Sequence, residues 1–164
     1  MQNLRIRTAT PKDAAPILEI YTPAVELTPA SFELTPPSVP EFAERIRSYS
    51  DTHEWLIAQD DGNILGYTYA TPHRPREAYR FSVETSVYVS EHARQRGVGR
   101  KLYSELFNRL SGKDFHNAFA GITLPNDASL NLHKAVGFTS IGVFREVGYK
   151  LGKWHSVSWW QRSI

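Results

Sequence analysis

The chain has 164 residues, the length of one domain, and its 41% hydrophobic and 22% charged residues are typical of a soluble globular protein. It has no cysteine, which excludes disulfide scaffolds, thiolate metal sites and an acyl group carried on an enzyme thiol. The formal net charge of +2 permits an anionic partner, but the chain has no basic stripe with interleaved aromatic residues, so we expect no nucleic-acid binding.

The N-terminal segment predicts a strand followed by a helix. Residues 1–7 lack the apolar run of a secretory signal, and no run of 18 apolar residues occurs, so we expect a cytoplasmic protein that does not span a membrane. Apolar residues alternate over residues 4–8, which predicts a strand. Thr10 and Asp13 form a capping box before an apolar helical pattern, in which Pro23 is expected to kink or end the helix.

The rest of the chain predicts a mixed α/β (α+β) sheet with helices on both faces. Ser38 and Glu41 repeat the capping box, and Asp60-Asp61-Gly62-Asn63 is typical of a hairpin turn. A helical crossover predicts that the strands before and after it are parallel. Residues 1–164 contain no linker or repeat and are interpreted as a single domain. The other expected elements are strands near 55–58, 64–69, 79–89, 117–122, 139–146 and 156–161, and helices near 98–110 and 127–136.

The strongest local signal is the basic loop Arg94-Gln95-Arg96-Gly97-Val98-Gly99-Arg100, which joins the long strand to a helix. Glycines let the backbone approach a ligand closely, and the free N–H groups at a helix start attract an anion. The loop therefore suits a pyrophosphate. It lacks the spacing and hydroxyl of a Walker loop and the third glycine of a Rossmann fingerprint, and an ordinary basic turn stays open as an alternative.

The pattern Arg94-x-x-Gly97-x-Gly99 after a long strand resembles the acetyl-CoA motif of the GNAT N-acetyltransferase superfamily, and the order of elements matches that fold along the whole chain. Segments Glu84–Val89, Leu124–Asp127 and Gly152–Gln161 resemble the phosphinothricin N-acetyltransferase group, which also acts on methionine sulfone and sulfoximine. The resemblance implies a mostly antiparallel sheet with one splayed parallel pair, acetyl-CoA as the acetyl donor, and a homodimer whose partner helps to close the active site.

The resemblance also implies which residues contact acetyl-CoA outside the loop. The main chain of the long strand would meet the cofactor, and an N–H at or near Val87 would stabilise the thioester oxygen. Asn126 can bond the pantetheine amide or act as a plain helix N-cap. The expected contacts are Val87, Tyr88, Val89, Asn126 and Ser129.

Two residues are candidates for catalysis. Acetyl transfer to an amine needs a neutral amine and a proton for the departing thiolate. Glu84 can take a proton from the substrate ammonium, and the resemblance places the catalytic glutamate at this position; a cross-strand ion pair, for example with an arginine, is the alternative. His133 stands where many superfamily members carry a tyrosine, so it can serve the thiolate, or it can cap or pack the helix.

Substrate recognition is expected around the segment that precedes Glu84. Arginines there can bind a carboxylate, phosphinate or sulfone oxygen, although a solvated basic loop is an equal alternative. The family often has Asn after Tyr21, where this chain has Thr22-Pro23, so the substrate-side contacts differ at that position. The expected substrate contacts are Phe32, Arg74, Arg76, Arg80, Glu84, Thr85 and Ser86.

The aromatic residues and histidines near the C-terminus have structural interpretations. Trp154, His155, Trp159 and Trp160 alternate along the closing strand, which predicts two buried faces, in the core or at a dimer contact. The histidines show no i, i+4 spacing on a helix, so we expect no metal. Those interpreted as loop residues are His53, His73, His92 and His116.

The leading hypothesis is direct transfer of acetyl from acetyl-CoA to the α-amine of a small amino-acid analogue. Glu84 would deprotonate the amine, and His133 would serve the thiolate. The absence of cysteine favours a ternary complex. An N-acetyltransferase for peptide or polyamine amines is one alternative, although the arginines before Glu84 oppose a polycation. A non-catalytic acyl-CoA sensor is another, and the presence of both Glu84 and His133 counts against it.

Overall fold

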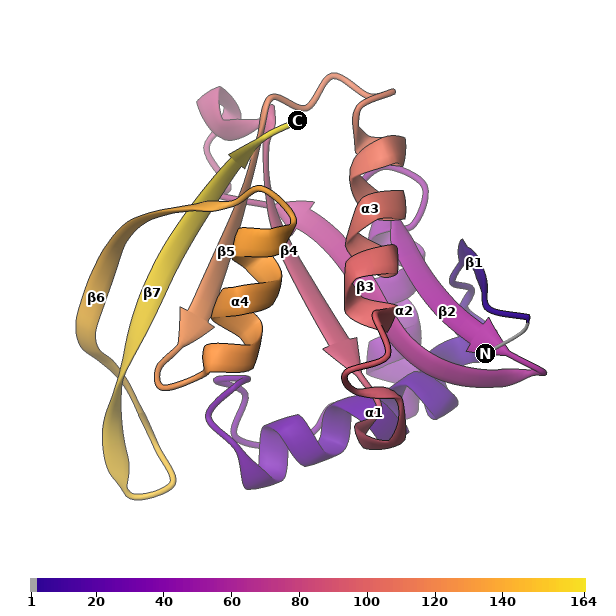
Figure 1. Ribbon diagram of the computed structural model, residues 1–164, viewed down its shortest axis with the longest axis horizontal. Coiled ribbons are helices and arrows are strands. Elements are labelled where there is room, and N and C mark those ends of the chain that lie inside the picture. Colours follow the sequence, from indigo (N-terminus) through magenta and orange to yellow (C-terminus); the bar gives the residue numbers. More distant parts are fainter. Residues whose placement is uncertain (1–2) are drawn as a thin grey trace.

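The computed structural model describes residues 3–164, which form a seven-stranded sheet with helices on both faces (Figure 1). The elements are β1 (Arg5–Thr8), α1 (Ala14–Leu27), α2 (Val39–Tyr49), β2 (Trp55–Asp60), β3 (Asn63–Pro72), β4 (Ser82–Val89), α3 (Val98–Leu110), β5 (Asn117–Thr123), α4 (Asp127–Ala135), β6 (Thr139–Lys150) and β7 (Lys153–Ser163), with 3-10 turns η1 (Pro11–Asp13), η2 (Glu77–Tyr79) and η3 (Glu91–Ala93). The strand order is β1-β2-β3-β4-β5-β7-β6, and within the described residues only β4 and β5 pair in parallel. The predicted mixed sheet and its parallel pair are confirmed.

Strand alternation divides the core into two layers. Along β2, Trp55 and Ile57 face a cluster made with α1 and α2, whereas Leu56 and Ala58 face a second cluster built around α3. All four side chains are buried, which explains why β2 reads as a continuous apolar run. The sheet therefore separates an α1–α2 side from an α3 side, and any group on β4 belongs to one side or the other.

The sequence predicted that Pro23 kinks or ends the first helix, and the helix does not end there, since α1 continues to Leu27. Proline removes one N–H, which leaves the carbonyl of Glu19 four residues earlier without its helical donor. Both Pro23 and Glu19 are exposed, so water can satisfy that carbonyl. Tyr21 and Val25 on the opposite side of α1 are buried, and this packing holds the helix together across the proline.

The long strand begins later than expected. Residues 77–79 form the turn η2, and β4 starts at Ser82 instead of Tyr79. The closing hairpin is longer than predicted, because β6 reaches Lys150 and β7 begins at Lys153.

Core packing does not bury both faces of the closing strand, because Trp154 is 59% exposed in the single chain, and the alternative of a dimer contact stays a prediction. His155 and Val157 on β7 are buried, and Trp159 and Trp160 are partly buried. The reason is the position of the hairpin: β6 is the last strand of the sheet, and nearly all of its side chains are exposed.

Candidate active site

The parallel strands β4 and β5 separate in the middle of the sheet. They pair at only three positions, the last of which sets Glu84 opposite Phe119. β4 continues to Val89 and β5 to Thr123, so beyond this point their facing main-chain groups have no strand partner within residues 3–164. The hydroxyl of Thr85 donates to the carbonyl of Phe119 at 3.4 Å, just where the strands part. An extended ligand can pair with free strand edges of this kind.

The predicted anion-binding loop leads from the open end of β4 into α3 (Figure 1). Gly97 caps α3 with a φ of 76°, a conformation that glycine adopts without strain. A Cβ on Gly97 would meet no protein atom within 4 Å, so the backbone is open on that side. The first N–H groups of α3, from Val98 onward, have no intrahelical partner. Arg94, Arg96 and Arg100 are exposed around the loop, so the site fits a negatively charged phosphate group.

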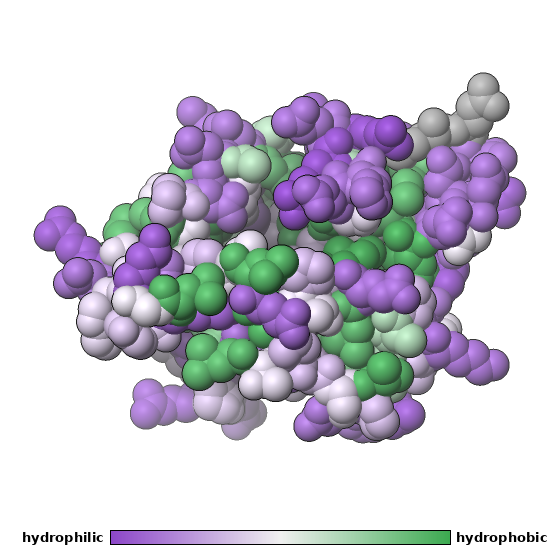
Figure 2. Space-filling view, turned by 90° about the horizontal axis from the view of Figure 1, so that it is seen from below, coloured by the Kyte–Doolittle hydropathy of each residue, from purple (hydrophilic) through white to green (hydrophobic). Residues whose placement is uncertain are grey.

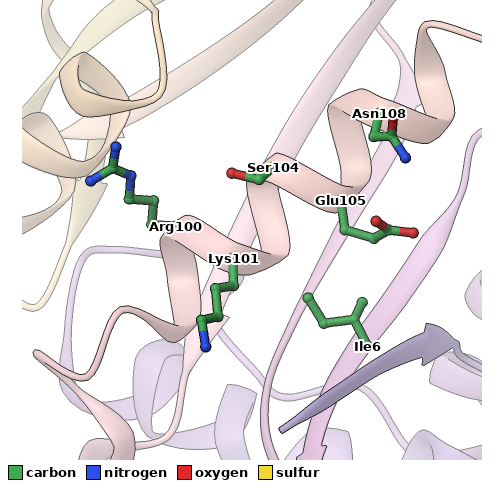
Figure 3. A pocket seen from close by; sticks show the side chains of 6 residues that line it. All are labelled: Ile6, Arg100, Lys101, Ser104, Glu105 and Asn108. Carbon is green, nitrogen blue, oxygen red and sulfur yellow. The ribbon is translucent and has the colours of Figure 1, made fainter.

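The outer side of α3 carries a separate hollow. Arg100 and Lys101 leave the helix in different directions, and Ile6 of β1 lies below its middle turns (Figure 3). The hollow measures about 640 Å³ and is open to solvent. Because β2 and β3 lie between β1 and β4, it is distant from Glu84 and is not a candidate for the reacting centre. Its lining residues are Ile6, Arg100, Lys101, Ser104, Glu105 and Asn108.

Glu84 lies at the point where the strands part, on the α1–α2 side of β4. Its side chain is 34% exposed, and its Oε2 atom lies 3.4 Å from Nδ1 of His73. Burial raises the pKa of Glu84 above its ordinary value, whereas His73 and the more distant Arg74 lower that pKa by smaller amounts. A carboxylate with a raised pKa is a stronger base, so Glu84 can take a proton from an ammonium group.

The partner of Glu84 is a histidine instead of the arginine that the sequence offered as an alternative. His73, which the sequence suggested was only a loop residue, follows β3 directly. Its main-chain N–H donates to the carbonyl of Ser82 at 3.2 Å. The antiparallel register sets Pro72 opposite Val83 and therefore His73 opposite Ser82, the first residue of β4, and no sequence signal gives this register.

His133 is buried on the α3 side of the sheet, in a network that sequence reasoning missed. Its Nδ1 lies 2.8 Å from the carbonyl of Ser129, and its Nε2 lies 2.9 Å from the hydroxyl of Tyr103. A carbonyl only accepts, so Nδ1 carries the proton and the Tyr103 hydroxyl donates to Nε2. Burial lowers the pKa of His133, and the bond to Ser129 opposes this shift. The imidazole is therefore neutral at pH 7. Asn126 accepts from the N–H of Ser129 at 3.1 Å, as expected of an N-cap.

The expected substrate contacts do not all lie together. Arg74, Arg76 and Arg80 are exposed in the segment between β3 and β4, at the end of β4 that leads to Glu84. Thr85 is buried and points to the α3 side, away from Glu84.

The loop between α1 and α2 reaches the distant hairpin. The carbonyl of Ser31 accepts from the Lys150 ammonium at 2.6 Å, and the ring of Phe32 lies over Gly148 of β6. Phe32 is therefore placed by long-range contacts that no local sequence signal reveals.

Ser86, the last of the expected substrate contacts, is on the same strand as Glu84, and its carbonyl accepts from the hydroxyl of Thr68 at 2.8 Å.

A splayed parallel pair, a helix start that fits a phosphate group at its open end and a carboxylate at its branch point are the features of an acetyl-CoA-dependent N-acetyltransferase. The comparisons with known proteins agree. Residues 6–159 match the family described as "Acetyltransferase (GNAT) domain", and the chain belongs to this GNAT family. Its acetyl donor is acetyl-CoA, and the predicted GNAT fold is confirmed.

Two relatives and one solved structure are similar over nearly the whole chain. Phosphinothricin N-acetyltransferase of Streptomyces viridochromogenes is 37% identical, over 98% of this chain and 88% of the relative. The L-methionine sulfoximine/L-methionine sulfone acetyltransferase of Pseudomonas aeruginosa is 35% identical, over 97% and 94%. The crystal structure of a phosphinothricin acetyltransferase from Sinorhizobium meliloti in complex with acetyl-CoA has a TM-score of 0.94 and 37% identity, over 98% and 88%.

Residues 3–164 contain neither a metal-binding cluster nor a helix that could span a membrane. No cluster of three or more histidine, aspartate or glutamate side chains is arranged to hold a metal ion. No helix in this part of the chain is both long and apolar enough to cross a membrane.

Proposed function

We propose that the protein transfers acetyl from acetyl-CoA to the α-amine of a small amino-acid analogue of the phosphinothricin, methionine sulfone or methionine sulfoximine type. The observation that carries the proposal is Glu84 at the branch point of β4 and β5. A thioester lying between the strands would be within reach of an amine that approaches from the α1–α2 side. The names of the relatives support this class of substrate.

Glu84 is the general base in this proposal. An α-ammonium group must lose a proton before it can attack, and acetyl-CoA supplies the activated acyl group and a thiolate leaving group. Burial brings the pKa of Glu84 closer to neutral pH, and a general base is most effective when its pKa lies near the working pH. The N–H groups of Val87 and Val89, which alternate with those that pair with β3 and so face the gap beyond Glu84, stabilise negative charge on the thioester oxygen.

The proton for the departing thiolate comes through the network around His133. Because Nδ1 donates to Ser129 and Nε2 accepts from Tyr103, the imidazole holds no free proton aimed outward. The Tyr103 hydroxyl is buried and gives its one proton to Nε2, so the donor in this network is the Ser129 hydroxyl, which His133 orients. The hydroxyl of Ser129 lies 3.2 Å from Nδ1 of His133.

The arginines before β4 bind the anionic groups of the substrate. Phosphinothricin carries a carboxylate and a phosphinate, and guanidinium groups bind such oxygens in pairs. Arg74, Arg76 and Arg80 are exposed and are not placed in an ion pair within residues 3–164, although the Arg80 guanidinium stacks on Phe81 and donates to the Glu77 carbonyl at 3.4 Å. A polyamine has no anionic group, and a peptide carries its carboxylate far from the reacting amine, so both would gain less from this cluster.

A thiol-release assay with purified protein and acetyl-CoA tests the proposal. We expect turnover of phosphinothricin and of methionine sulfone, and much slower turnover of spermidine and of an alanyl peptide. Binding of acetyl-CoA is measured in parallel by calorimetry. Binding of acetyl-CoA without turnover of either amino-acid analogue would contradict the proposed substrate class.

A substitution at Gly148 tests whether Phe32 borders the bound substrate. A Cβ at this position would lie 2.3 Å from the Phe32 ring, so Gly148→Ala must displace that ring. We expect the KM for the amine to rise roughly tenfold while the KM for acetyl-CoA stays constant. Gly112→Ala is the matched control, because its Cβ would meet only the Arg109 carbonyl at an ordinary 3.5 Å. An unchanged KM for the amine would show that Phe32 does not border the substrate.

The exposed face of the β6–β7 hairpin is the proposed homodimer contact. Five large hydrophobic side chains of β6 are about half exposed, an arrangement that marks a protein–protein contact. Hydrophobic residues also reach the surface among polar ones on the lower face of the molecule (Figure 2). The exposed residues of the hairpin are Ile141, Val143, Phe144, Val147, Tyr149, Leu151 and Trp154.

A charge on this face should separate the dimer. We expect Phe144→Asp to shift the mass measured by light scattering from dimer to monomer at micromolar concentration, because burying an unpaired carboxylate costs several kcal/mol. Val39→Asp is the control, since Val39 is similarly exposed at the start of α2, outside the hairpin. A wild-type protein that is monomeric at high concentration would contradict the proposed dimer.

A further inference from the structure

His73 is held in place by aromatic neighbours. Its ring stacks on Phe119 with centroids 4.3 Å apart and planes 18° apart, and the rings of Tyr79 and Trp159 meet its edges at 5.8 and 6.3 Å. Its side chain is only 12% exposed. These contacts come from η2, β5 and β7, so three separate parts of the chain fix the orientation of the imidazole.

The buried nitrogen of His73 faces Glu84 and nothing else. Nδ1 has no hydrogen-bond partner within residues 3–164, although it lies 3.4 Å from Oε2 of Glu84. A buried polar atom without a partner is unfavourable, and a small rotation of the Glu84 side chain would satisfy it. The stacked ring cannot make the same adjustment, so the imidazole is the fixed member of the pair and the carboxylate is the movable one.

We propose that His73 is a positioning residue that orients the carboxylate of Glu84 and keeps it ionised. This inference rests on the proposed role of Glu84 as the general base. The imidazole N–H donates to one carboxylate oxygen, which leaves the other oxygen directed toward the substrate ammonium. His73 does not touch the reacting atoms and acts only through Glu84.

The charges around Glu84 determine the sign of the expected pH effect. Burial raises the pKa of Glu84, and His73, whose Nδ1 lies 3.4 Å from Oε2, is the main influence that lowers it again. Arg74 is the other group that lowers it. The remaining neighbours carry no charge at neutral pH: Thr71 opposite Glu84 on β3, Tyr79 on η2, Phe119 on β5 and Trp159 on β7. Without His73, only Arg74 opposes burial, so Glu84 must protonate at higher pH.

The test compares kcat/KM for the amine from pH 5 to 9 in three variants. His73→Phe keeps an aromatic ring against Phe119 but removes the N–H, and His73→Asn loses the ring but returns an N–H near the Nδ1 position. His116→Phe is the matched control, because His116 is an exposed histidine at the start of β5. Acetyl-CoA affinity and thermal unfolding are measured for each.

We expect His73→Phe to move the acid limb of kcat/KM upward by about half to one pH unit, which at low pH is a roughly 3–10-fold loss. The change should fall on kcat, with the affinity for acetyl-CoA unchanged. His73→Asn should bring the acid limb back toward its wild-type position and leave no more than about a third of the shift that His73→Phe causes. His116→Phe should behave like the wild type.

Two results separate this inference from the proposed function. If Glu84→Gln abolishes turnover but His73→Phe leaves the acid limb in place, the role of His73 is wrong and that of Glu84 stands. If Glu84→Gln retains turnover, the proposed base is wrong, and with it the inference. Should His73→Phe fail to fold, His73→Leu makes the same comparison, because it also removes the N–H.

Discussion

Replacing Glu84 with Gln is expected to lower kcat for acetyl transfer by roughly 10²–10⁴-fold at neutral pH, the usual contribution of a general base. The amide has nearly the shape of the carboxylate but cannot take a proton. Burial has raised the pKa of Glu84, so the wild-type carboxylate is a stronger base than an exposed one. The rate of the variant should recover in part at high pH, where the substrate amine is already neutral in solution.

Steady-state kinetics between pH 6 and pH 10 check this expectation. Acetyl-CoA affinity should stay within about twofold of the wild type, because Glu84 faces the α1–α2 side and not the loop at α3. Glu77→Gln is the matched control, since Glu77 is an exposed carboxylate on the nearby turn η2. Turnover within about fivefold of the wild type at pH 7 would remove Glu84 from the role of base. An acyl-CoA sensor would bind acetyl-CoA but show no turnover even as the wild type.

Local signals were sufficient for the parts of the site that are continuous in the chain. The glycine loop and α3 could be predicted together, because a positive φ at Gly97 and an amphipathic pattern from Val98 to Leu110 are both encoded within 14 neighbouring residues. Alternation alone predicted a strand that carries Glu84, although Glu84 is the third residue of β4 and not at its middle. The capping boxes of Thr10–Asp13 and Ser38–Glu41 are present as predicted.

Long-range packing decided what the sequence could not show. His73 became a partner of Glu84 only because β3 and β4 pair in one register and Phe119 arrives from β5 to stack on it. The hydrogen bond between Tyr103 and His133 spans 30 residues, and no role was predicted for Tyr103 from the sequence. In neither case does spacing along the chain reveal the contact.

The aromatic closing hairpin shows a different limit of sequence reasoning. An apolar residue at a protein–protein contact and one in the core give the same alternating pattern. Trp154 and Val157 lie on one strand, but Trp154 is 59% exposed and Val157 is 8% exposed. Which side chains of the hairpin are exposed depends on the position of β6 at the edge of the sheet, and that position depends on the whole topology.

Replacing Gly97 with Val should weaken acetyl-CoA binding about 10–100-fold, as expected when one or two charge-assisted hydrogen bonds to phosphate are lost. Gly97 has a φ of 76°, and its missing side chain leaves open space where a phosphate can approach the first N–H groups of α3. The valine would occupy that space and also strain the backbone, because a β-branched residue rarely adopts a positive φ. Binding to acetyl-CoA is measured by calorimetry at low and high salt.

A second glycine separates strain from loss of the phosphate site. Gly62 in the β2–β3 turn has a φ of 85°, and a Cβ there would also meet no protein atom within 4 Å. Gly62→Val therefore carries a similar backbone cost, and both variants should unfold at lower temperature by a similar amount. Only Gly97→Val should lose acetyl-CoA affinity and the salt dependence that accompanies phosphate binding. Equal affinity losses in the two variants would mean that backbone strain alone explains the effect, and the phosphate would then have to bind elsewhere than at the start of α3.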